Sequence, residues 1–238
     1  MYIPPQNMEI EKIYCNLLMG HNNSIAICSA NQGEGVTSIA LALAQRNLLA
    51  GKSTLVVDFN LYRPSFNKLL PTDTNKLTSD ESLESPQLVT TNEQDSVALI
   101  GVTSPKRRDL VLKLRHPGIL EQCIEEWKTS YDTIIFDTSP INRVNANNIP
   151  AERVAAACDA CLLVVLAGHT TEAMVTSAVD KLNTAGAQLQ GCIYNDRDNP
   201  TLQKELLREV SRLEPKHNWL TRTIRNLINN SRLLTLEI

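Results

Sequence analysis

Short, almost wholly apolar segments alternate along the chain with longer segments whose apolar residues recur every three to four positions. Segments of the first kind are typical of β-strands buried on both faces, because a strand with one wet face alternates apolar and polar residues. Segments of the second kind predict amphipathic helices that cover those strands. The predicted strands are residues 24–29, 54–58, 97–102, 133–137, 160–166 and 190–194, and the predicted helices are 37–50, 118–130 and 171–185.

The alternation of buried strands with helices predicts an α/β fold, with a doubly wound, mostly parallel sheet and helices on both faces. We expect one α/β domain over residues 24–200, with a helical segment over 1–23 before it and a helical extension over 201–238 after it. Residues 71–95 are rich in Thr, Ser, Asp, Glu and Asn, a composition that predicts a loop.

The C-terminal extension contains one strongly amphipathic stretch. Residues 219–228 combine apolar side chains with Arg222 and Arg225, which predicts a basic amphipathic helix. Such a helix packs back on the sheet, docks on a partner or lies at a membrane surface, and the sequence leaves these three alternatives open. The apolar residues of the stretch are Trp219, Leu220, Ile224, Leu227 and Ile228.

Composition and charge restrict the class of protein. The net charge of −3 gives no electrostatic basis for general nucleic-acid binding. The longest aliphatic runs are too short to cross a bilayer and the N-terminus lacks the layout of a secretory signal, so we expect a cytoplasmic protein. Six scattered cysteines suit reduced thiols, and the C-x-x-C pair of Cys158 and Cys161 lacks the two further ligands of a zinc site. No Ser, His and Asp order indicates hydrolase chemistry.

Residues 28–38 (CSANQGEGVTS) join the first predicted strand to the first predicted helix, which is the place of a phosphate-binding loop. Such a loop wraps backbone N–H groups around phosphates, places a lysine on the β- and γ-phosphate oxygens and puts a hydroxyl on Mg²⁺. This chain keeps the glycines and the hydroxyl but has valine where the pattern has lysine. The candidate nucleotide-binding residues here are Gly33, Glu34, Gly35, Val36, Thr37 and Ser38.

Two aspartates end predicted strands at the edge of the sheet where this loop lies. Asp58 closes the strand 54–58 and Asp137 closes the strand 133–137, and open α/β folds gather functional groups at such carboxyl ends. With the Thr37 hydroxyl, the two carboxylates can hold a hydrated Mg²⁺ against a β/γ-phosphate pair, and they are the candidate catalytic residues if the protein is active. The alternative is that each aspartate only caps the following turn, but the order and spacing of the loop favour a nucleotide site.

Three ordered motifs resemble the bacterial tyrosine kinase (BY-kinase) family of the MinD/ParA group of P-loop proteins. That family has a loop S-x-x-P-G-E-G-K-S-T, a second motif near V-D-x-D-x-R-x-P and a third near D-x-x-I-I-D-T-P-P. The similar segments here are residues 29–38, 57–64 (VDFNLYRP) and 132–140 (DTIIFDTSP). The resemblance covers roughly residues 25–200 and implies a MinD/ParA-like P-loop fold with ATP or ADP and Mg²⁺ as cofactors. It also implies a nucleotide contact for Asn195, which stands where family members place an asparagine that reads the adenine edge.

The departures from the family pattern concern the parts that carry kinase activity. Val36 replaces the catalytic lysine, Asn31 is not the second lysine of many MinD/ParA proteins, and Asn60 replaces the second carboxylate of V-D-x-D. No tyrosine occurs after Tyr194, so we expect the tyrosine-rich tail of the family to be absent. The family's N-terminal E-x-x-R-x-x-R assembly motif is blurred in residues 9–15.

Loss of the lysine has a calculable effect. A hydrogen bond to a charged group contributes about 1.5–3 kcal/mol, so its loss weakens triphosphate binding by roughly 10- to 150-fold. The backbone cradle and Mg²⁺ can preserve some binding, whereas phosphoryl transfer depends on preorganised charge around the γ-phosphate. Compensation by Arg63, or by a partner protein in trans, is a less favoured route.

The resemblance therefore implies a degenerate, pseudokinase-like BY-kinase relative with weak or no catalysis. It would act in the cytoplasm, or peripherally at the inner membrane, as a regulatory partner of exopolysaccharide or capsule assembly. The implied partner is an inner-membrane polysaccharide co-polymerase-type protein, and self-association and a membrane contact through the C-terminal helix are further expectations. Two alternatives stay open: an active ATPase or tyrosine kinase with a non-standard loop, and a MinD/ParA-like spatial regulator that binds membrane or a partner.

Overall fold

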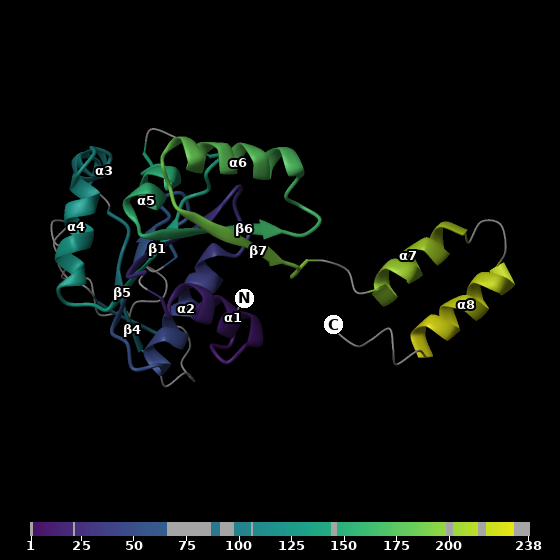
Figure 1. Cartoon of the computed structure of the whole chain (residues 1–238). Helices are drawn as coiled ribbons and strands as arrows, with labels where there is room; N and C mark the ends of the chain where they lie inside the picture. Colours follow the sequence, from purple (N-terminus) through teal and green to yellow (C-terminus); the bar gives the residue numbers. More distant parts are fainter. Residues whose placement is uncertain are drawn as a thin grey trace. The chain divides into compact units, whose positions relative to one another are not determined.

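The structure is a computed structural model that describes residues 2–20, 22–65, 87–90, 98–105, 107–143, 147–198, 202–213 and 218–230. The chain divides into two compact units, Met1–Asn195 and Asp196–Ile238, and each is described by itself. Within its described residues, the first unit contains one seven-stranded sheet with helices on both faces (Figure 1).

The strands run across the sheet in the order β3-β4-β2-β5-β1-β6-β7. All neighbouring pairs are parallel except β3 and β4, which are antiparallel. The central strands β1, β2 and β5 are buried along their whole length, which explains why their sequences are apolar almost throughout. The strands are β1 (Ser24–Ser29), β2 (Thr54–Phe59), β3 (Gln87–Thr90), β4 (Ala98–Val102), β5 (Thr133–Thr138), β6 (Ala160–Leu166) and β7 (Leu189–Asn195).

The two edge strands differ from the sequence-based expectation. Gln87–Thr90 forms β3, so the loop prediction for residues 71–95 was wrong there; pairing with β4 provides backbone hydrogen bonds to a short strand within a polar stretch. The rest of 71–95 lies outside the described residues. Side chains of β7 alternate between partly buried and exposed, although this strand too was expected to be covered on both faces. Among the strands that the structure describes, β7 lies at the edge of the sheet and has a neighbour on one side only.

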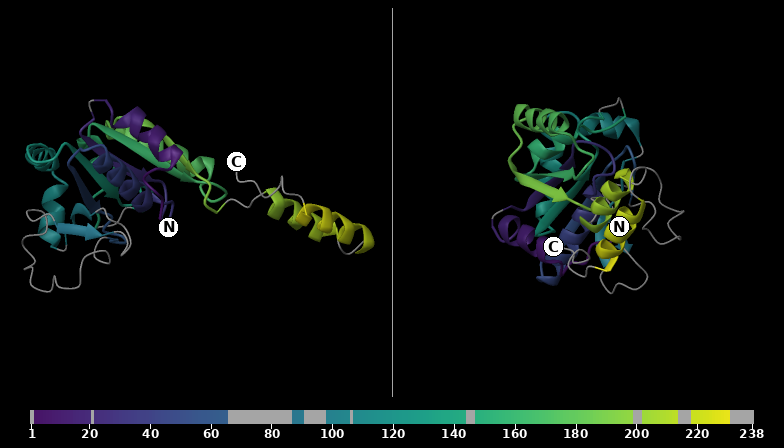
Figure 2. Two further views of the ribbon diagram at one scale, coloured as in Figure 1. Left: turned by 90° about the horizontal axis from the view of Figure 1, so that it is seen from below. Right: turned by 90° about the vertical axis from the view of Figure 1, so that its right-hand side faces the viewer.

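Two buried apolar clusters separate the sheet from two layers of helices. One cluster joins the sheet to α3, α4, α5 and α6, and the other joins the opposite face to α1 and α2. The right-hand view of Figure 2 shows α6 and α1 on opposite sides of the sheet. The predicted doubly wound, mostly parallel α/β fold is thus confirmed. The helices are α1 (Met8–Leu17), α2 (Val36–Leu49), α3 (Arg108–Leu114), α4 (Ile119–Lys128), α5 (Ala151–Ala157) and α6 (Glu172–Thr184).

Helices α3 and α5 were not predicted from the sequence, because each is about two turns long and shows too little periodicity. The other four helices of this unit include the three that were predicted individually, each within a few residues of the expected ends. Helix ends are the least certain part of such predictions, since the terminal turns lack intrahelical hydrogen bonds.

The N-terminal helix α1 packs directly on α2. The Asn7 side chain caps it by accepting from the backbone N–H of Glu9 at 2.8 Å. Arg46 of α2 donates to both carboxylate oxygens of Glu11, and its guanidinium lies 4.1 Å from the centroid of the Tyr14 ring. Because Ile10, Tyr14 and Leu17 are also buried, α1 belongs to the same compact unit as the sheet. The predicted boundaries at residues 23 and 200 stay a proposal.

The second unit contains a pair of helices, α7 (Leu202–Leu213) and α8 (Asn218–Asn230). Val210 of α7 and Ile228 of α8 are buried, and Arg225 donates to the Ser211 hydroxyl at 3.2 Å. The basic amphipathic helix expected at 219–228 lies within α8, but what its apolar face contacts stays a prediction. In the part of the chain that the structure describes, no helix has both the length and the apolar character needed to span a membrane.

We expect Leu17→Ala to lower the free energy of unfolding by about 2–5 kcal/mol, because it leaves a cavity where a side chain 3% exposed is packed. Chemical denaturation followed by circular dichroism measures the change. Met19→Ala is the matched control, since Met19 is 68% exposed and its truncation should change stability by less than about 0.5 kcal/mol. Equal effects of the two substitutions would mean that α1 is not part of the folded core.

Candidate functional site

The phosphate-binding loop expected from the sequence connects β1 to α2 and keeps the backbone shape of such a loop. Gly33 and Gly35 have φ angles of +82° and +103°, a region that side chains disfavour and glycine tolerates. Gly35 is the N-cap of α2, so the backbone N–H groups of the first helical turn point toward the edge of the sheet where the parallel strands end. A helix N-terminus in this position favours an anion such as phosphate.

Asn195, at the end of β7, closes this loop from the side. Its amide Nδ2 donates to the backbone carbonyl of Glu34 at 2.9 Å. A Cβ atom added to Gly35 would lie 2.6 Å from the same nitrogen, so a side chain there would have to displace the Asn195 amide. The expected contact of Asn195 with a nucleotide base stays a prediction, while its contact with the loop is a structural role that the sequence did not reveal.

The Glu34 side chain ties the loop to the segment after β6. The residue is 3% exposed, and its Oε1 accepts from the Thr170 hydroxyl at 2.6 Å and from the Asn31 amide at 3.4 Å. Thr170 was not among the expected site residues, although it follows a strand end, as the other functional positions do. These contacts hold the loop in its curved form.

Val36, at the position of the missing lysine, is the first residue of α2 and is buried with 6% of its surface exposed. Its side chain is part of the apolar cluster that also contains Ile10 of α1 and Ile39 of α2. The substitution therefore removes a charge from the loop and adds apolar packing beneath it.

Asp58 and Asp137 lie directly beside each other, because the parallel pairing of β2 and β5 sets them in register. Asp137 is fully buried, its Oδ2 accepts from the Thr37 hydroxyl at 2.6 Å, and its Oδ1 has no hydrogen-bond partner among the described residues. Burial, and then the neighbouring Asp58 carboxylate, raise the pKa of Asp137 to about 8 against the opposing effect of the Thr37 hydrogen bond.

Asp58 also organises the loop that follows β2. Its Oδ1 accepts from the backbone N–H of Asn60 at 3.0 Å, and its Oδ2 accepts from that of Ser65 at 2.9 Å. The Asn60 side chain in turn accepts from the backbone N–H of Arg63 at 3.1 Å. The capping role that was the alternative for Asp58 is thus present in the structure, and Asn60 serves the same turn. Ser65 Oγ lies 3.4 Å from Thr37 Oγ1, which brings this loop against the phosphate-binding loop.

The donor set fits a hydrated Mg²⁺. Thr37, Asp58 and Asp137 offer only oxygen atoms, the type of ligand that Mg²⁺ prefers, and the buried Oδ1 of Asp137 lacks any other partner in the described part of the chain. A carboxylate oxygen carries two lone pairs, so an Asp58 oxygen that accepts a backbone hydrogen bond can also face a cation. Within the described ranges no group of three or more His, Cys, Asp or Glu side chains is placed for a metal, so these two carboxylates and one hydroxyl would hold the ion with water.

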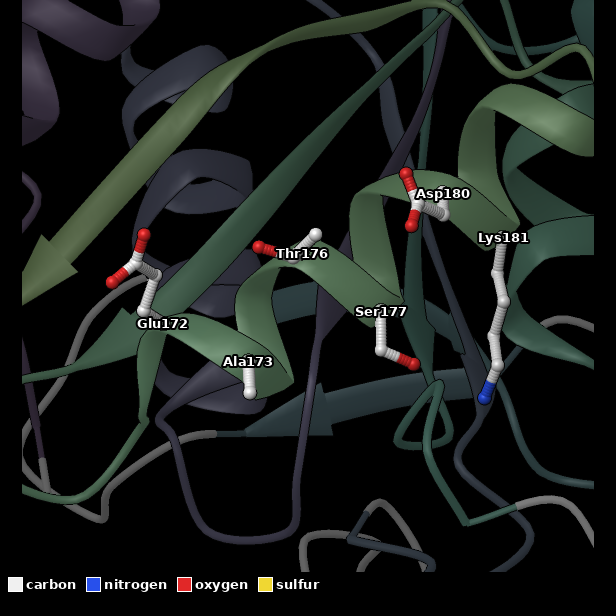
Figure 3. A pocket seen from close by; sticks show the side chains of 6 residues that line it. All are labelled: Glu172, Ala173, Thr176, Ser177, Asp180 and Lys181. Carbon is white, nitrogen blue, oxygen red and sulfur yellow. The ribbon is translucent and has the colours of Figure 1, made fainter.

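The loop after β5 is held by helix α6. Asn142 Oδ1 accepts from Ser177 Oγ at 3.2 Å and from Lys181 Nζ at 3.0 Å, and Asn142 Nδ2 donates to the Met174 carbonyl at 3.3 Å. Figure 3 shows Ser177 and Lys181 on one side of α6 and Thr176 and Asp180 on the other. These side chains line a shallow pocket on the helix, together with Glu172 and Ala173. The pocket contains none of the expected site residues.

The two cysteines of the C-x-x-C motif are buried in the larger apolar cluster. Burial, and then the neighbouring Cys192, raise the pKa of the Cys161 thiol to about 12. Burial likewise raises the pKa of Cys158 well above its usual range. Both thiols are therefore protonated near neutral pH and contribute apolar packing.

The chain is similar in sequence to several curated proteins. The chain is 29% identical over 184 residues to the tyrosine-protein kinase CpsD of Streptococcus agalactiae, covering 73% of this chain and 75% of that protein. It is 25% identical over 181 residues to the putative tyrosine-protein kinase CapB of Staphylococcus aureus, covering 72% and 74%. The succinoglycan biosynthesis transport protein ExoP of Rhizobium meliloti is 24% identical over 81% of this chain, which is 25% of ExoP. No family model matches the chain.

Solved structures show the same fold. The chimerical protein CapA2B2 superposes with a TM-score of 0.62 and 22% identity, covering 80% of this chain and 84% of that one. The cell division ATPase MinD of Pyrococcus furiosus gives a TM-score of 0.56 and 19% identity, with coverage of 75% and 74%. A cobyrinic acid a,c-diamide synthase of Mycobacterium smegmatis with bound ADP and magnesium gives a TM-score of 0.56 and 15% identity, with coverage of 82% and 82%.

We expect Gly35→Ala to lower the free energy of unfolding by more than Gly33→Ala. Both substitutions place a side chain at positive φ, which costs about 1–2 kcal/mol, but only Gly35→Ala also drives a Cβ into the Asn195 amide. Urea denaturation of the two variants measures the difference. Adding Asn195→Ala should recover part of the loss in Gly35→Ala and none in Gly33→Ala. The close contact between position 35 and Asn195 would be contradicted if Gly33→Ala and Gly35→Ala lost equal stability and Asn195→Ala recovered none of it.

The Asp58 and Asp137 pair predicts a pH dependence of stability in Mg²⁺-free buffer. A raised pKa means that the folded protein holds a proton which the unfolded chain has released above about pH 4. The free energy of unfolding should therefore fall as the pH rises from about 5 to 8, by at most about 1.4 kcal/mol per pH unit. Denaturant titrations at several pH values measure the slope.

Asp137→Asn should flatten this slope, because it removes the titrating carboxyl. Asp132→Asn is the control: hydrogen bonds from Ser53 lower the pKa of Asp132, so its titration lies below this window and the slope should persist. An unchanged slope in Asp137→Asn would show that another group causes it.

Proposed function

We propose that this chain, which belongs to the BY-kinase family within the P-loop group, is a degenerate member that binds ATP or ADP with Mg²⁺ and has weak or no catalysis. The observation that carries the proposal is Val36, buried in the core at the position of the lysine. Phosphoryl transfer relies on fixed positive charge around the γ-phosphate, and at this position an isopropyl group cannot supply it.

Retained binding is supported by what remains at the site. The backbone of Gly33 and Gly35 keeps the curvature of a phosphate cradle, and the N-terminus of α2 offers backbone N–H donors. Thr37, Asp58 and Asp137 would hold Mg²⁺, which when bound with nucleotide supplies the charge that neutralises the phosphates. The loop backbone and the N-terminus of α2 would then orient the phosphates. The buried position of Asp137 would exclude water from that side of the site.

The names of the relatives support a proposal for the setting. ExoP is named as a succinoglycan biosynthesis transport protein, and the CpsD and CapB relatives are named as tyrosine-protein kinases. We extend this to a regulatory role in exopolysaccharide or capsule assembly at the cytoplasmic side of the inner membrane, with a polysaccharide co-polymerase-type protein as partner. Contact of α8 with membrane, and self-association, are parts of the same proposal.

The test is a titration of the full chain with ATP and with ADP, with and without Mg²⁺, followed by isothermal calorimetry and a thermal-shift assay. We expect binding that requires Mg²⁺, with a dissociation constant roughly 10- to 150-fold weaker than that of a lysine-bearing relative. Asp137→Ala should abolish the Mg²⁺ dependence, and ATP hydrolysis should stay near background. Brisk hydrolysis or autophosphorylation by the wild-type chain would contradict the proposal and favour an active enzyme.

Val36→Lys tests the missing charge. It should tighten Mg²⁺·ATP binding, because an ammonium group returns to the β- and γ-phosphates, without restoring kinase activity, because Asn60 still replaces a carboxylate. Val36→Ala is the matched control that removes the same apolar packing without adding charge, and it should leave affinity unchanged. Recovery of kinase activity by Val36→Lys alone would show that the lysine was the single deficit. ATP-dependent dimerisation in light scattering would instead favour a MinD/ParA-like regulator.

A further inference from the structure

We propose that Arg143 supplies the positive charge that Val36 lacks, by contacting the terminal phosphate of a bound nucleotide. The inference rests on the proposed function, because it presumes nucleotide in the loop between β1 and α2. It concerns binding and adds a residue to the site that no sequence motif indicated.

The loop that carries Arg143 is bonded to the phosphate-binding loop. It leaves β5 directly after Asp137 and Thr138, and Arg143 follows Asp137 by six residues. The backbone N–H of Ile141 donates to the carbonyl of Ser29 at 2.9 Å, and that of Asn142 donates to the carbonyl of Ala30 at 3.0 Å. Arg143 is therefore one residue away from a direct contact with the segment where the phosphate-binding loop begins.

The Arg143 side chain is directed toward the loop that follows β2. Its Nη1 donates to the Tyr62 hydroxyl at 3.3 Å, and its guanidinium carbon lies 5.9 Å from the centroid of the Tyr62 ring. The same loop returns to the phosphate-binding loop where Ser65 Oγ approaches Thr37 Oγ1. Arg143 thus bridges the two loops that begin at the ends of β2 and β5, next to the Asp58 and Asp137 pair.

The backbone at Arg143 is held in place by α6. Asn142, its neighbour in sequence, accepts hydrogen bonds from Ser177 and Lys181, and Lys181 also donates to the Ile141 carbonyl at 3.3 Å. Lys181 is a second cation beside this loop, but its ammonium is engaged in holding the loop. Among the described residues, the exposed guanidinium of Arg143 makes one hydrogen bond and one ring contact, both with Tyr62. A phosphate can replace this interaction, because arginine binds phosphate through two parallel N–H donors.

Arg63 is the competing cation on the loop after β2. Its backbone N–H is bonded to Asn60, but its exposed side chain makes no ion pair or hydrogen bond within the described part of the chain. A side chain without contacts loses more rotamer freedom on binding than one that is already oriented. This difference favours Arg143.

The experiment compares the affinities of the full chain for Mg²⁺·ATP, Mg²⁺·ADP and AMP by isothermal calorimetry. Arg143→Ala should weaken Mg²⁺·ATP binding by about 10-fold or more, weaken Mg²⁺·ADP binding less, and leave AMP binding unchanged, because the effect follows the number of phosphates. Arg143→Lys should retain part of the affinity, since it keeps the charge without the planar fork. Arg63→Ala is the charge-matched control and should bind all three ligands as the wild type does.

Each other outcome overturns the inference. An unchanged ATP affinity in Arg143→Ala overturns it while nucleotide binding itself stands. An equal loss for ATP, ADP and AMP indicates a structural role for Arg143 and overturns a phosphate contact. A selective loss in Arg63→Ala and none in Arg143→Ala assigns the charge to Arg63. Absence of any nucleotide binding by the wild-type chain overturns the proposed function and this inference together.

Discussion

Two carboxylates that the sheet sets side by side are the constraint on which the site depends. Parallel pairing of β2 with β5 places Asp58 opposite Asp137, and adjacent strands lie about 4.8 Å apart. Two ionised acids at that separation repel strongly in a buried environment, so a proton or a cation must balance them. The surroundings reflect this need: Thr37 donates to one oxygen of Asp137, Asp58 accepts two backbone N–H groups, and one Asp137 oxygen lacks a partner in the described residues. Protonation of Asp137 relieves this repulsion when no metal is present, and the oxygen atoms of the pair suit Mg²⁺.

Position 36, at the same edge of the sheet, can contribute either to the apolar core or to ligand binding. The first residue of α2 lies at the boundary between the phosphate-binding loop and the apolar cluster beneath it. A lysine at that position would contact the ligand, whereas Val36 packs in the cluster that joins α1 and α2 to the sheet. A valine there contributes apolar packing and offers no charge to a phosphate, so the fold does not depend on a lysine at this position.

Hydrogen bonds connect the loops around the candidate site to distant parts of the chain. Asn142, Ser177 and Lys181 connect the loop after β5 to α6, and Tyr62 connects it to the loop after β2. Glu34 and Asn195 connect the phosphate-binding loop to the segments after β6 and β7. The loop after β5 is in turn bonded to the phosphate-binding loop at Ser29 and Ala30, so α6 and the two loops belong to one hydrogen-bonded network.

The sequence by itself determined the α/β class, the six parallel strands, the loop of residues 33–38 and the two strand-end aspartates, because apolar periodicity and local glycine geometry are properties of neighbouring residues. It did not predict β3, α3 or α5, which are short and depend on partners remote in sequence. Only the tertiary structure decided the register of Asp58 with Asp137, the burial of Val36, the contact of Asn195 with Glu34 and the bridge between Arg143 and Tyr62. Each of these features joins residues that are far apart along the chain. Their separation in space depends on strand order and side-chain packing, and no local sequence pattern encodes either of these.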